Sequence, residues 1–457
     1  MDVVARPRWH HSRMRNRGVA SCVVVLFAGT LAAQEYYSVP GVDAPELARR
    51  GRYAVGVRTL QIVHPAQVDI LHFDKASGKA PLYDRPLTLE VWYPATIPPG
   101  KEERTTYESA MPGDPNRLPA GMPKTFRIAG KALRDVPSVT GERFPLVVVS
   151  HGYPGSRTFL SYLTENLASK GYVVAAIDHT DSVDGAVREF QSTLLNRASD
   201  QLFTIHALEK QSEKADDFLH GLLDVSRVAI VGYSMGGYGA LTSAGAGYSM
   251  KSPAMGYVPG GYLEEWTAGN PKFEALDRKS VKAVVAIAPW GAQPPYNLWD
   301  DEGLAGIGIP SLFIAGDQDD VSGFEPGTKR VFEHAVHSDR CLLVYENANH
   351  NVGGNPPPPE VMGDFVTREH FDEPVWRKDR IVAINQHFVT AFLDLYLKGD
   401  ESRRAYLHPV VEKSNDGKWP VKQGESTGAA VSDGATYWKG FQRRWALGLE
   451  MHCKAAE

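Results

Sequence analysis

Hydrophobic and polar positions follow two different patterns along the chain. Residues 53–62 and 87–93 alternate between apolar and polar side chains, which predicts antiparallel strands. From residue 144 onward, short apolar runs alternate with longer stretches of helical period. This alternation predicts an α/β fold, a mostly parallel sheet with helices on both faces. The predicted strands are residues 146–150, 172–177, 228–231, 283–288, 311–315 and 342–345, and the predicted helices are residues 159–170, 198–218 and 379–397.

Other segments do not fit this pattern. Residues 98–123 are rich in proline and polar side chains and are predicted to be loop. Residues 246–280 are too long for an ordinary connection and carry several aromatic side chains, which predicts a cap-like insertion after the small-residue helix that opens at residues 236–239. Residues 437–449 are expected to add a strand or hairpin. The predicted regions are therefore N-terminal strands and loop (34–143), a catalytic core (144–400) with the 246–280 insertion, and a C-terminal extension (401–457).

The N-terminal segment has the composition of a secretory signal peptide. Five arginines precede an apolar run over residues 18–33 that ends in small residues. This run is shorter than the roughly 20 residues that cross a bilayer, although an uncleaved anchor is the alternative. Removing residues 1–33, with five Arg and one Asp, would change the formal net charge from −5 to −9. We therefore expect a secreted or periplasmic acidic protein with no stable membrane span and no nucleic-acid partner.

The composition limits the chemistry further. The 457 residues are 43% hydrophobic and 23% charged, as in soluble globular proteins. Beyond the predicted signal, only Cys341 and Cys453 remain, which is too few for a thiolate zinc cluster. The sequence allows either one disulfide between them or two free thiols. No zinc-protease, dinucleotide or P-loop motif occurs, so we expect no metal and no cofactor.

Residues 232–236 fit the pattern G-x-S-x-G with Ser234 at its centre. The bare pattern is weak evidence, but here a buried apolar run (228–231) precedes it and a small-residue helix follows it. A strand-turn-helix elbow of this kind exposes a serine hydroxyl. Serine is a weak nucleophile that needs a histidine base oriented by a carboxylate. We therefore predict that Ser234 is a nucleophile.

The acid and the base should follow Ser234 in the chain, in that order. The loop after residues 311–315 carries Asp317, Asp319 and Asp320. We favour Asp319, with Asp320 as the next choice and Asp317 as a turn residue. The next predicted strand leads into His350, which is the best candidate for the base.

The oxyanion of an acyl-transfer intermediate needs two preorganised N–H donors. The backbone N–H of Met235, directly after the nucleophile, is the first candidate. The second should come from the loop after residues 146–150, where we choose Tyr153.

With these residues in view, the chain resembles the α/β-hydrolase superfamily over about residues 50–400. Within it, the strand motifs at 144–152 and 167–179 resemble the dienelactone-hydrolase-like and platelet-activating-factor-acetylhydrolase-like branch. The chain is also similar to bacterial cutinases and polyester hydrolases at residues 150–153, 234–237, 288–290 and 347–350.

The resemblance implies roles for particular residues. By position, it implies Tyr153 and Met235 as oxyanion donors and Trp290 as an aromatic wall of the acyl pocket, with core packing as the alternative for Trp290. Dienelactone hydrolases typically carry Cys at the nucleophile position, where this chain has Ser234. The insertion and the tail beyond residue 400 also exceed a minimal polyester hydrolase.

We expect an exported, metal-independent serine hydrolase that cleaves a small-molecule or lipid-like carboxylic ester through an acyl-enzyme. An amidase or peptidase with the same three residues is the nearest alternative. A non-catalytic binding protein on a hydrolase scaffold is the other.

Overall fold

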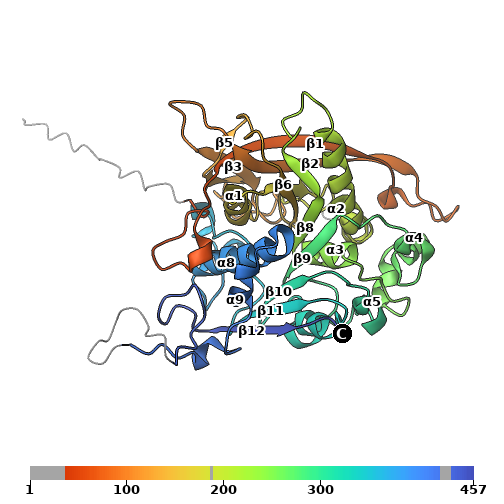
Figure 1. Cartoon of the computed structure of the whole chain (residues 1–457). Helices are drawn as coiled ribbons and strands as arrows, with labels where there is room; N and C mark the ends of the chain where they lie inside the picture. The colour runs from red at the N-terminus through yellow and green to blue at the C-terminus, as the bar shows by residue number, and fades with distance from the viewer. Residues whose placement is uncertain (1–35, 186–188, 422–433) are drawn as a thin grey trace, which may run out of the picture. The chain divides into compact units, whose positions relative to one another are not determined.

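The computed structural model describes residues 36–185, 189–421 and 434–457. The predicted signal peptide lies outside the described residues. Within them, a ten-stranded sheet has the order β12-β11-β10-β9-β8-β6-β7-β2-β1-β5 (Figure 1). Its strands are β1 (Ala54–Val68), β2 (Leu82–Ala95), β5 (Leu133–Arg134), β6 (Phe144–Ser150), β7 (Val173–Asp178), β8 (Leu223–Tyr233), β9 (Val281–Ile287), β10 (Ser311–Gly316), β11 (Arg340–Tyr345) and β12 (Leu449–Lys454).

The middle of the sheet is parallel and its flanks are partly antiparallel. Strands β7, β6, β8, β9, β10 and β11 each run parallel to their neighbours in this group. Strand β2 is antiparallel to both β1 and β7, and β12 is antiparallel to β11. Because the carboxyl ends of the parallel strands lie at one edge, the loops that follow them meet there.

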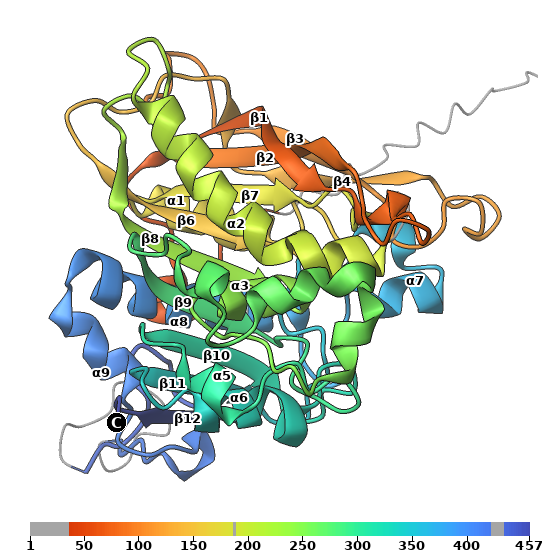
Figure 2. The ribbon, with the colours of Figure 1, turned by 90° about the vertical axis from the view of Figure 1, so that its right-hand side faces the viewer.

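Helices cover both faces of the sheet. Helices α2 (Phe190–Ser212) and α3 (Met235–Ser243) lie on the face turned to the viewer in Figure 2. Helices α1 (Ser161–Ser169) and α8 (Lys378–Lys398) pack against each other and share the other core. Strand β6 alternates between these cores, with Val147 and Val149 in one and Leu146 and Val148 in the other. The shorter helices are α4 (Pro271–Glu274), α5 (Asp301–Ala305), α6 (Arg330–His334), α7 (Phe365–Glu369) and α9 (Arg404–Leu407).

The sheet confirms the predicted fold class, but the prediction that residues 98–123 are loop is wrong in part. Strand β3 (Thr105–Ala110) lies inside this segment and pairs with β4 (Thr125–Gly130). Its residues are alternately buried and exposed, and buried Tyr107 accepts a hydrogen bond from Trp92 Nε1 at 2.7 Å. The prolines flank this strand and do not interrupt it, so the backbone can pair. Helix α2 also begins earlier than predicted, at Phe190.

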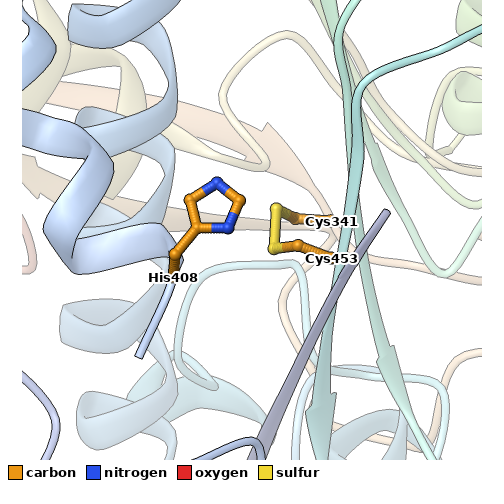
Figure 3. Close-up of side chains that lie close together, drawn as sticks. All are labelled: Cys341, His408 and Cys453. Carbon is orange, nitrogen blue, oxygen red and sulfur yellow. A yellow bond between two sulfur atoms is a disulfide. The ribbon is translucent and has the colours of Figure 1, made fainter. Parts of the chain in front are cut away.

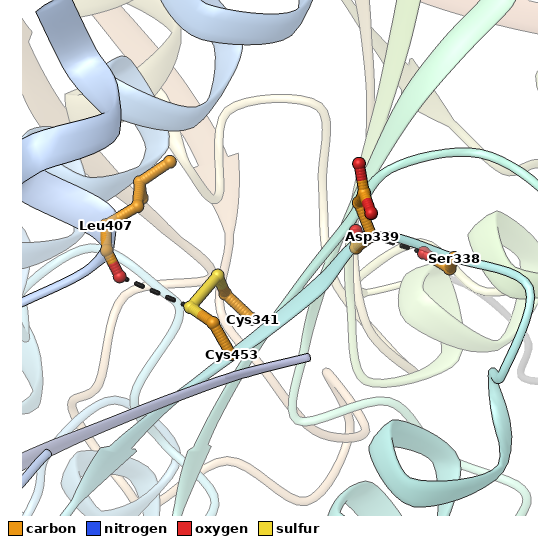
Figure 4. Close-up of a disulfide and its surroundings, with 5 residues drawn as sticks. All are labelled: Ser338, Asp339, Cys341, Leu407 and Cys453. Atoms are coloured by element: carbon orange, nitrogen blue, oxygen red, sulfur yellow. Dashed lines mark hydrogen bonds between the residues drawn. A yellow bond between two sulfur atoms is a disulfide. The ribbon is translucent and has the colours of Figure 1, made fainter. Parts of the chain in front are cut away.

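The C-terminal extension adds one strand, later than predicted. Residues 437–448 form turns and connecting segments, and β12 begins at Leu449. A disulfide joins Cys341 on β11 to Cys453 on β12, at directly paired positions of the two strands (Figure 3). The carbonyl oxygen of Leu407 lies 3.2 Å from Cys453 Sγ (Figure 4). Of the two alternatives for these cysteines, the structure therefore has the disulfide.

The 246–280 insertion is built from short helical turns. It contains η3 (Pro253–Tyr257), η4 (Pro259–Trp266) and α4. Two backbone hydrogen bonds between Tyr248 and residues 266 and 268 close its ends into one unit. The insertion is therefore folded onto the body of the protein and is not an extended loop.

Candidate functional site

Ser234 lies at the sharp turn between β8 and α3. Its φ of 53° and ψ of −116° are unfavourable for a residue with a side chain. The turn is possible because Gly232 and Gly236 flank it. A Cβ on Gly232 would lie 2.1 Å from the Gly236 carbonyl oxygen, and one on Gly236 would lie 2.0 Å from the Ser150 carbonyl oxygen. The elbow predicted from the sequence pattern is therefore present, and the side chain of Ser234 is at its apex.

Three side chains from three loops form a hydrogen-bonded chain at this edge of the sheet. His350, after β11, has Nε2 3.0 Å from Ser234 Oγ. Its Nδ1 lies 3.0 Å from each carboxylate oxygen of Asp319, which follows β10. Among the three aspartates of that loop, Asp319 contacts the imidazole. Asp317 instead accepts the N–H of Asn347 at 2.6 Å, and Asp320 is exposed.

The surroundings of Asp319 favour the ionised carboxylate. Burial raises its pKa, but the hydrogen bond and charge of His350 and the N–H groups of Ser322 and Val321 lower it, and the net pKa is below the usual value. These N–H groups reach Oδ1 at 2.8 and 2.9 Å. Because the carboxylate only accepts, Nδ1 of His350 carries the proton. Nε2 is then free to accept the Ser234 hydroxyl proton.

Both predicted oxyanion donors belong to segments that lie close to Ser234. Met235 is the first residue of α3. The loop that contains Tyr153 passes close to Ser234, because a Cβ on Gly152 would lie 3.4 Å from Ser234 Cβ.

Arg197 from α2 supports the backbone of this loop. It donates to the carbonyl oxygen of His151 at 2.7 Å and of Gly152 at 3.4 Å. Sequence reasoning missed Arg197, since an arginine within a helix carries no local signal for such a role.

A second serine-histidine-aspartate chain lies under the same loop. Ser150 Oγ is 2.8 Å from His179 Nε2, and His179 Nδ1 is 2.9 Å from Asp200 Oδ2. All three residues are 0% exposed, and both oxygens of Asp200 also accept hydrogen bonds from the buried Arg85. No substrate can reach Ser150 in this structure, so we interpret this set as a polar support for the core.

Trp290 is joined to Ser234 through the backbone and lies within a group of aromatic side chains. Its backbone N–H donates to the Ser234 carbonyl oxygen at 3.1 Å, and the residue is 7% exposed. The ring centroid is 4.4 Å from that of Tyr296 and 5.5 Å from that of Phe190. Phe190 also contacts Tyr153 and, from the insertion, Tyr257. The sequence did not predict this group, because its members come from four separate segments.

One group of side chains in the described part of the chain has the spacing of metal ligands. The ligand atoms of Cys341, His408 and Cys453 lie within 4.8 Å of one another (Figure 3). Zinc binds cysteine as the thiolate. Because these two sulfurs are bonded to each other, the oxidised group offers no thiolate.

In the parts of the chain that the structure describes, no helix is both long and apolar enough to cross a membrane.

A mostly parallel sheet with helices on both faces, and a serine at the elbow after β8, define the α/β-hydrolase fold. Residues 129–268 match a family model described as PETase, PET hydrolase-like. The chain is 25% identical to cutinase est1 of Thermobifida alba over 205 residues, which are 45% of this chain and 52% of that protein. It is 28% identical to the platelet-activating factor acetylhydrolase of Cavia porcellus over 138 residues, which cover 22% of this chain and 32% of that protein.

Among solved structures, a ferulic acid esterase from Streptomyces cinnamoneus matches with a TM-score of 0.48 and 21% identity, over 78% of this chain and 94% of that one. The chain spans about half the length of the cutinases it matches. The family model and the cutinase and acetylhydrolase matches confirm the resemblance to α/β-hydrolases with cutinase-like motifs.

Proposed function

We propose that this protein is a serine-dependent carboxylic ester hydrolase. The observation that carries the proposal is the chain of hydrogen bonds from Asp319 through His350 to Ser234 at a strained elbow. The similarity to cutinases and to a platelet-activating factor acetylhydrolase supports ester hydrolysis.

In the proposed reaction, Ser234 Oγ attacks the ester carbonyl carbon while His350 Nε2 takes the hydroxyl proton. The carbonyl oxygen becomes an oxyanion that accepts the N–H groups of Tyr153 and Met235. When the bond to the alcohol oxygen breaks, His350 returns the proton to that oxygen and the alcohol leaves. A water molecule then attacks the acyl carbon while His350 takes one of its protons. As the bond to Ser234 Oγ breaks, His350 returns this proton to Oγ, and the acid and free Ser234 are released.

The aromatic group around Trp290 supports an apolar acyl or lipid-like part in the substrate. The ring of Phe190 packs against those of Trp290 and Tyr257, and the backbone of Trp290 is bonded to that of Ser234. Aromatic surfaces of this kind bind apolar groups well. The substrate class we propose is therefore a small-molecule or lipid-like carboxylic ester.

Export is the second part of the proposal. The composition of residues 1–33 is that of a signal peptide, and the Cys341–Cys453 disulfide suits an oxidising compartment outside the cytoplasm. Sequencing the N-terminus of protein recovered from the periplasm or medium should find a start close to Gln34. An intact Met1 in that protein would contradict export by cleavage.

Covalent labelling is the direct test of the reaction. A fluorophosphonate should label the protein once, on the tryptic peptide 228–251 that contains Ser234. The buried Ser150 is on a different peptide, 144–157, and provides an internal control. A panel of matched esters and amides, compared between the native protein and Ser234→Ala, then separates an esterase from an amidase. Label on another residue, or ester turnover that survives Ser234→Ala, would contradict the proposal.

A further inference from the structure

The loop that carries His350 is held from the outside by one carboxylate. Glu373 Oε2 accepts the N–H of Asn349 at 2.9 Å, and Glu373 Oε1 accepts the N–H of Asn351 at 2.6 Å. The residues directly before and after His350 are thus bound to the same side chain. Glu373 is only 5% exposed. Hydrogen bonds from backbone N–H groups to a carboxylate are stronger than those between neutral groups, so this contact restrains the backbone on both sides of the imidazole.

Lys378, at the start of α8, completes the clamp. Its Nζ donates a hydrogen bond to the carbonyl oxygen of Asn351, and the residue is 6% exposed. Burial lowers the pKa of Lys378 to about 8, against the opposing charges of Glu373 and Asp372. Burial also raises the pKa of Glu373, against its two backbone hydrogen bonds and the charges of Lys378 and His350. The two buried groups therefore compensate each other's charge while they hold the same loop.

Further contacts fix Asn351 in the same place. Its Nδ2 donates to the carbonyl oxygen of Glu369 at 2.6 Å and to that of Asp372 at 3.2 Å. From the nucleophile strand, the hydroxyl of Tyr233 donates to Asn351 Oδ1 at 3.2 Å. The backbone at residues 349–351 is thus joined to residues 369–378 on one side and to β8 on the other.

We propose that Glu373 is a positioning residue for His350. It holds the imidazole at hydrogen-bonding distance from Ser234 and adds a second negative charge near the base, beside that of Asp319. The inference rests on the proposed function, since it assigns a role within the same reaction.

Other titratable groups also lie around the base. The ring centroid of Tyr233 is 5.3 Å from that of His350. The cavity of about 640 Å³ that His350 lines is also bordered by the titratable side chains of Asp320, Arg368, Glu369, His370 and Asp372. Arg368 is paired with Asp372 at 2.7 Å, so these two charges largely compensate each other. Glu373 is therefore the acidic group, apart from Asp319, that is both buried and bonded to this loop.

Two consequences distinguish positioning from simple support of the fold. A displacement of about 1 Å in a catalytic group can cost about 10²-fold in rate, so loss of the clamp should lower kcat more than it changes KM. Loss of the charge should also disfavour the imidazolium, so the acidic limb of kcat/KM should move to lower pH. A residue that only stabilised the fold would leave the position of that limb unchanged.

The test compares Glu373→Gln with the matched control Glu369→Gln, which removes an exposed carboxylate of the same segment whose side chain is outside the clamp. A glutamine keeps one acceptor but turns an NH₂ group toward the other backbone N–H. We expect the rate at which a fluorophosphonate labels Ser234 to fall ten- to a hundredfold, and kcat to fall by the same factor. KM should stay within about threefold of the native value. The acidic limb of the kcat/KM profile should move to lower pH. The control should stay within twofold and show no shift.

A double variant, Glu373→Gln with Lys378→Met, separates the clamp from the cost of an unpaired buried lysine. We expect it to remain as slow as the single variant, with melting temperatures showing that both are folded at the assay temperature. A double variant that regains the native rate would overturn the proposal.

The proposal would also be overturned by a folded Glu373→Gln protein that is labelled at the native rate and whose kcat/KM falls at the same acidic pH as that of the native protein. If the native protein itself were not labelled at Ser234, the proposed function would fail as well. Native labelling together with native behaviour of Glu373→Gln would reject the positioning role alone.

Discussion

Replacing Asp319 by asparagine removes one charge and little else, which makes its effect predictable from the structure. Oδ1 of Asp319 accepts the N–H groups of Val321 and Ser322 at 2.9 and 2.8 Å, so an asparagine must keep its oxygen at this position. The same oxygen lies 3.0 Å from Nδ1 of His350, so an acceptor for the Nδ1 proton remains, while Oδ2, also 3.0 Å from Nδ1, is replaced by an NH₂ group. The imidazole can therefore keep its orientation and its tautomer in the variant, and the main loss is the carboxylate charge opposite the imidazolium that forms in the transition state.

The size of this loss follows from Coulomb's law. Two unit charges about 4 Å apart interact by about 4 kcal/mol at an effective dielectric constant of about 20. At about 1.36 kcal/mol per tenfold change in rate, kcat should fall by roughly 10³-fold. This is less than the roughly 10⁴-fold loss expected where an asparagine also imposes the wrong tautomer.

The measurement is kcat on an activated ester, at a pH where the native rate has reached its plateau. Asp320→Asn is the matched control, because it removes an exposed carboxylate from the next position of the same loop, and it should stay within twofold of the native rate. If Asp319→Asn were nearly as active as the native protein and Asp320→Asn were not, the acid would be Asp320. A fall of 10⁴-fold or more in Asp319→Asn would refute the inference that the imidazole keeps its tautomer.

Four other outcomes are expected. The base must be neutral to take the Ser234 proton, so kcat/KM should fall when the medium is made acidic enough to protonate the imidazole. Dialysis against EDTA should leave the neutral-pH rate unchanged, and loss of activity on chelation with recovery on zinc addition would contradict the serine mechanism. The Cys341–Cys453 disulfide closes a loop with a sequence separation of 112 residues. Replacing both cysteines by serine should therefore lower the free energy of unfolding, measured by urea titration, by up to about 4.8 kcal/mol, while kcat stays near the native value. Equal stability of the two proteins would contradict a closed bridge. Burial lowers the pKa of His387 to about 3, so the folded state excludes a proton that the unfolded state binds below about pH 6.5. The free energy of unfolding should therefore fall as the pH drops from 6.5 toward 3, by up to about 1.4 kcal/mol per pH unit for this group. Replacing His387 by glutamine should reduce this dependence of the unfolding free energy on pH.

Residues that lie close in sequence to a recognisable strand end could be predicted from the chain alone. Ser234 and His350 each follow a buried apolar run at the distance a short loop requires, and the structure brings them to 3.0 Å. The choice among three aspartates of one loop was harder, because it depends on how the backbone turns after β10. That turn directs Asp317 to the N–H of Asn347 and Asp319 to the imidazole.

The supports of the site could not be predicted in the same way. Arg197 and Glu373 act through backbone groups of loops that are 45 and 22 residues away in sequence. A backbone carbonyl or N–H has no signature in the sequence, so nothing marks the side chain that will bind it. The start of β12 was predicted too early for a related reason. This strand pairs with the distant β11 and is joined to it by the disulfide, and the alternation of its own residues does not determine that pairing.

The buried set of Ser150, His179 and Asp200 differs from the proposed catalytic set in position and not in hydrogen bonding. Its hydrogen-bond distances, 2.8 and 2.9 Å, are as short as those around Ser234. Yet Ser150 ends a regular strand under the oxyanion loop, and it is 0% exposed, whereas Ser234 is 7% exposed at a turn with positive φ. Burial also lowers the pKa of His179 well below its usual value, with the charges of Arg197 and Arg85 adding to the effect, so the surroundings of this imidazole favour its neutral form. The proposed function therefore assigns nucleophilic catalysis to Ser234 and not to Ser150, because the elbow after β8 exposes the Ser234 hydroxyl while Ser150 is fully buried.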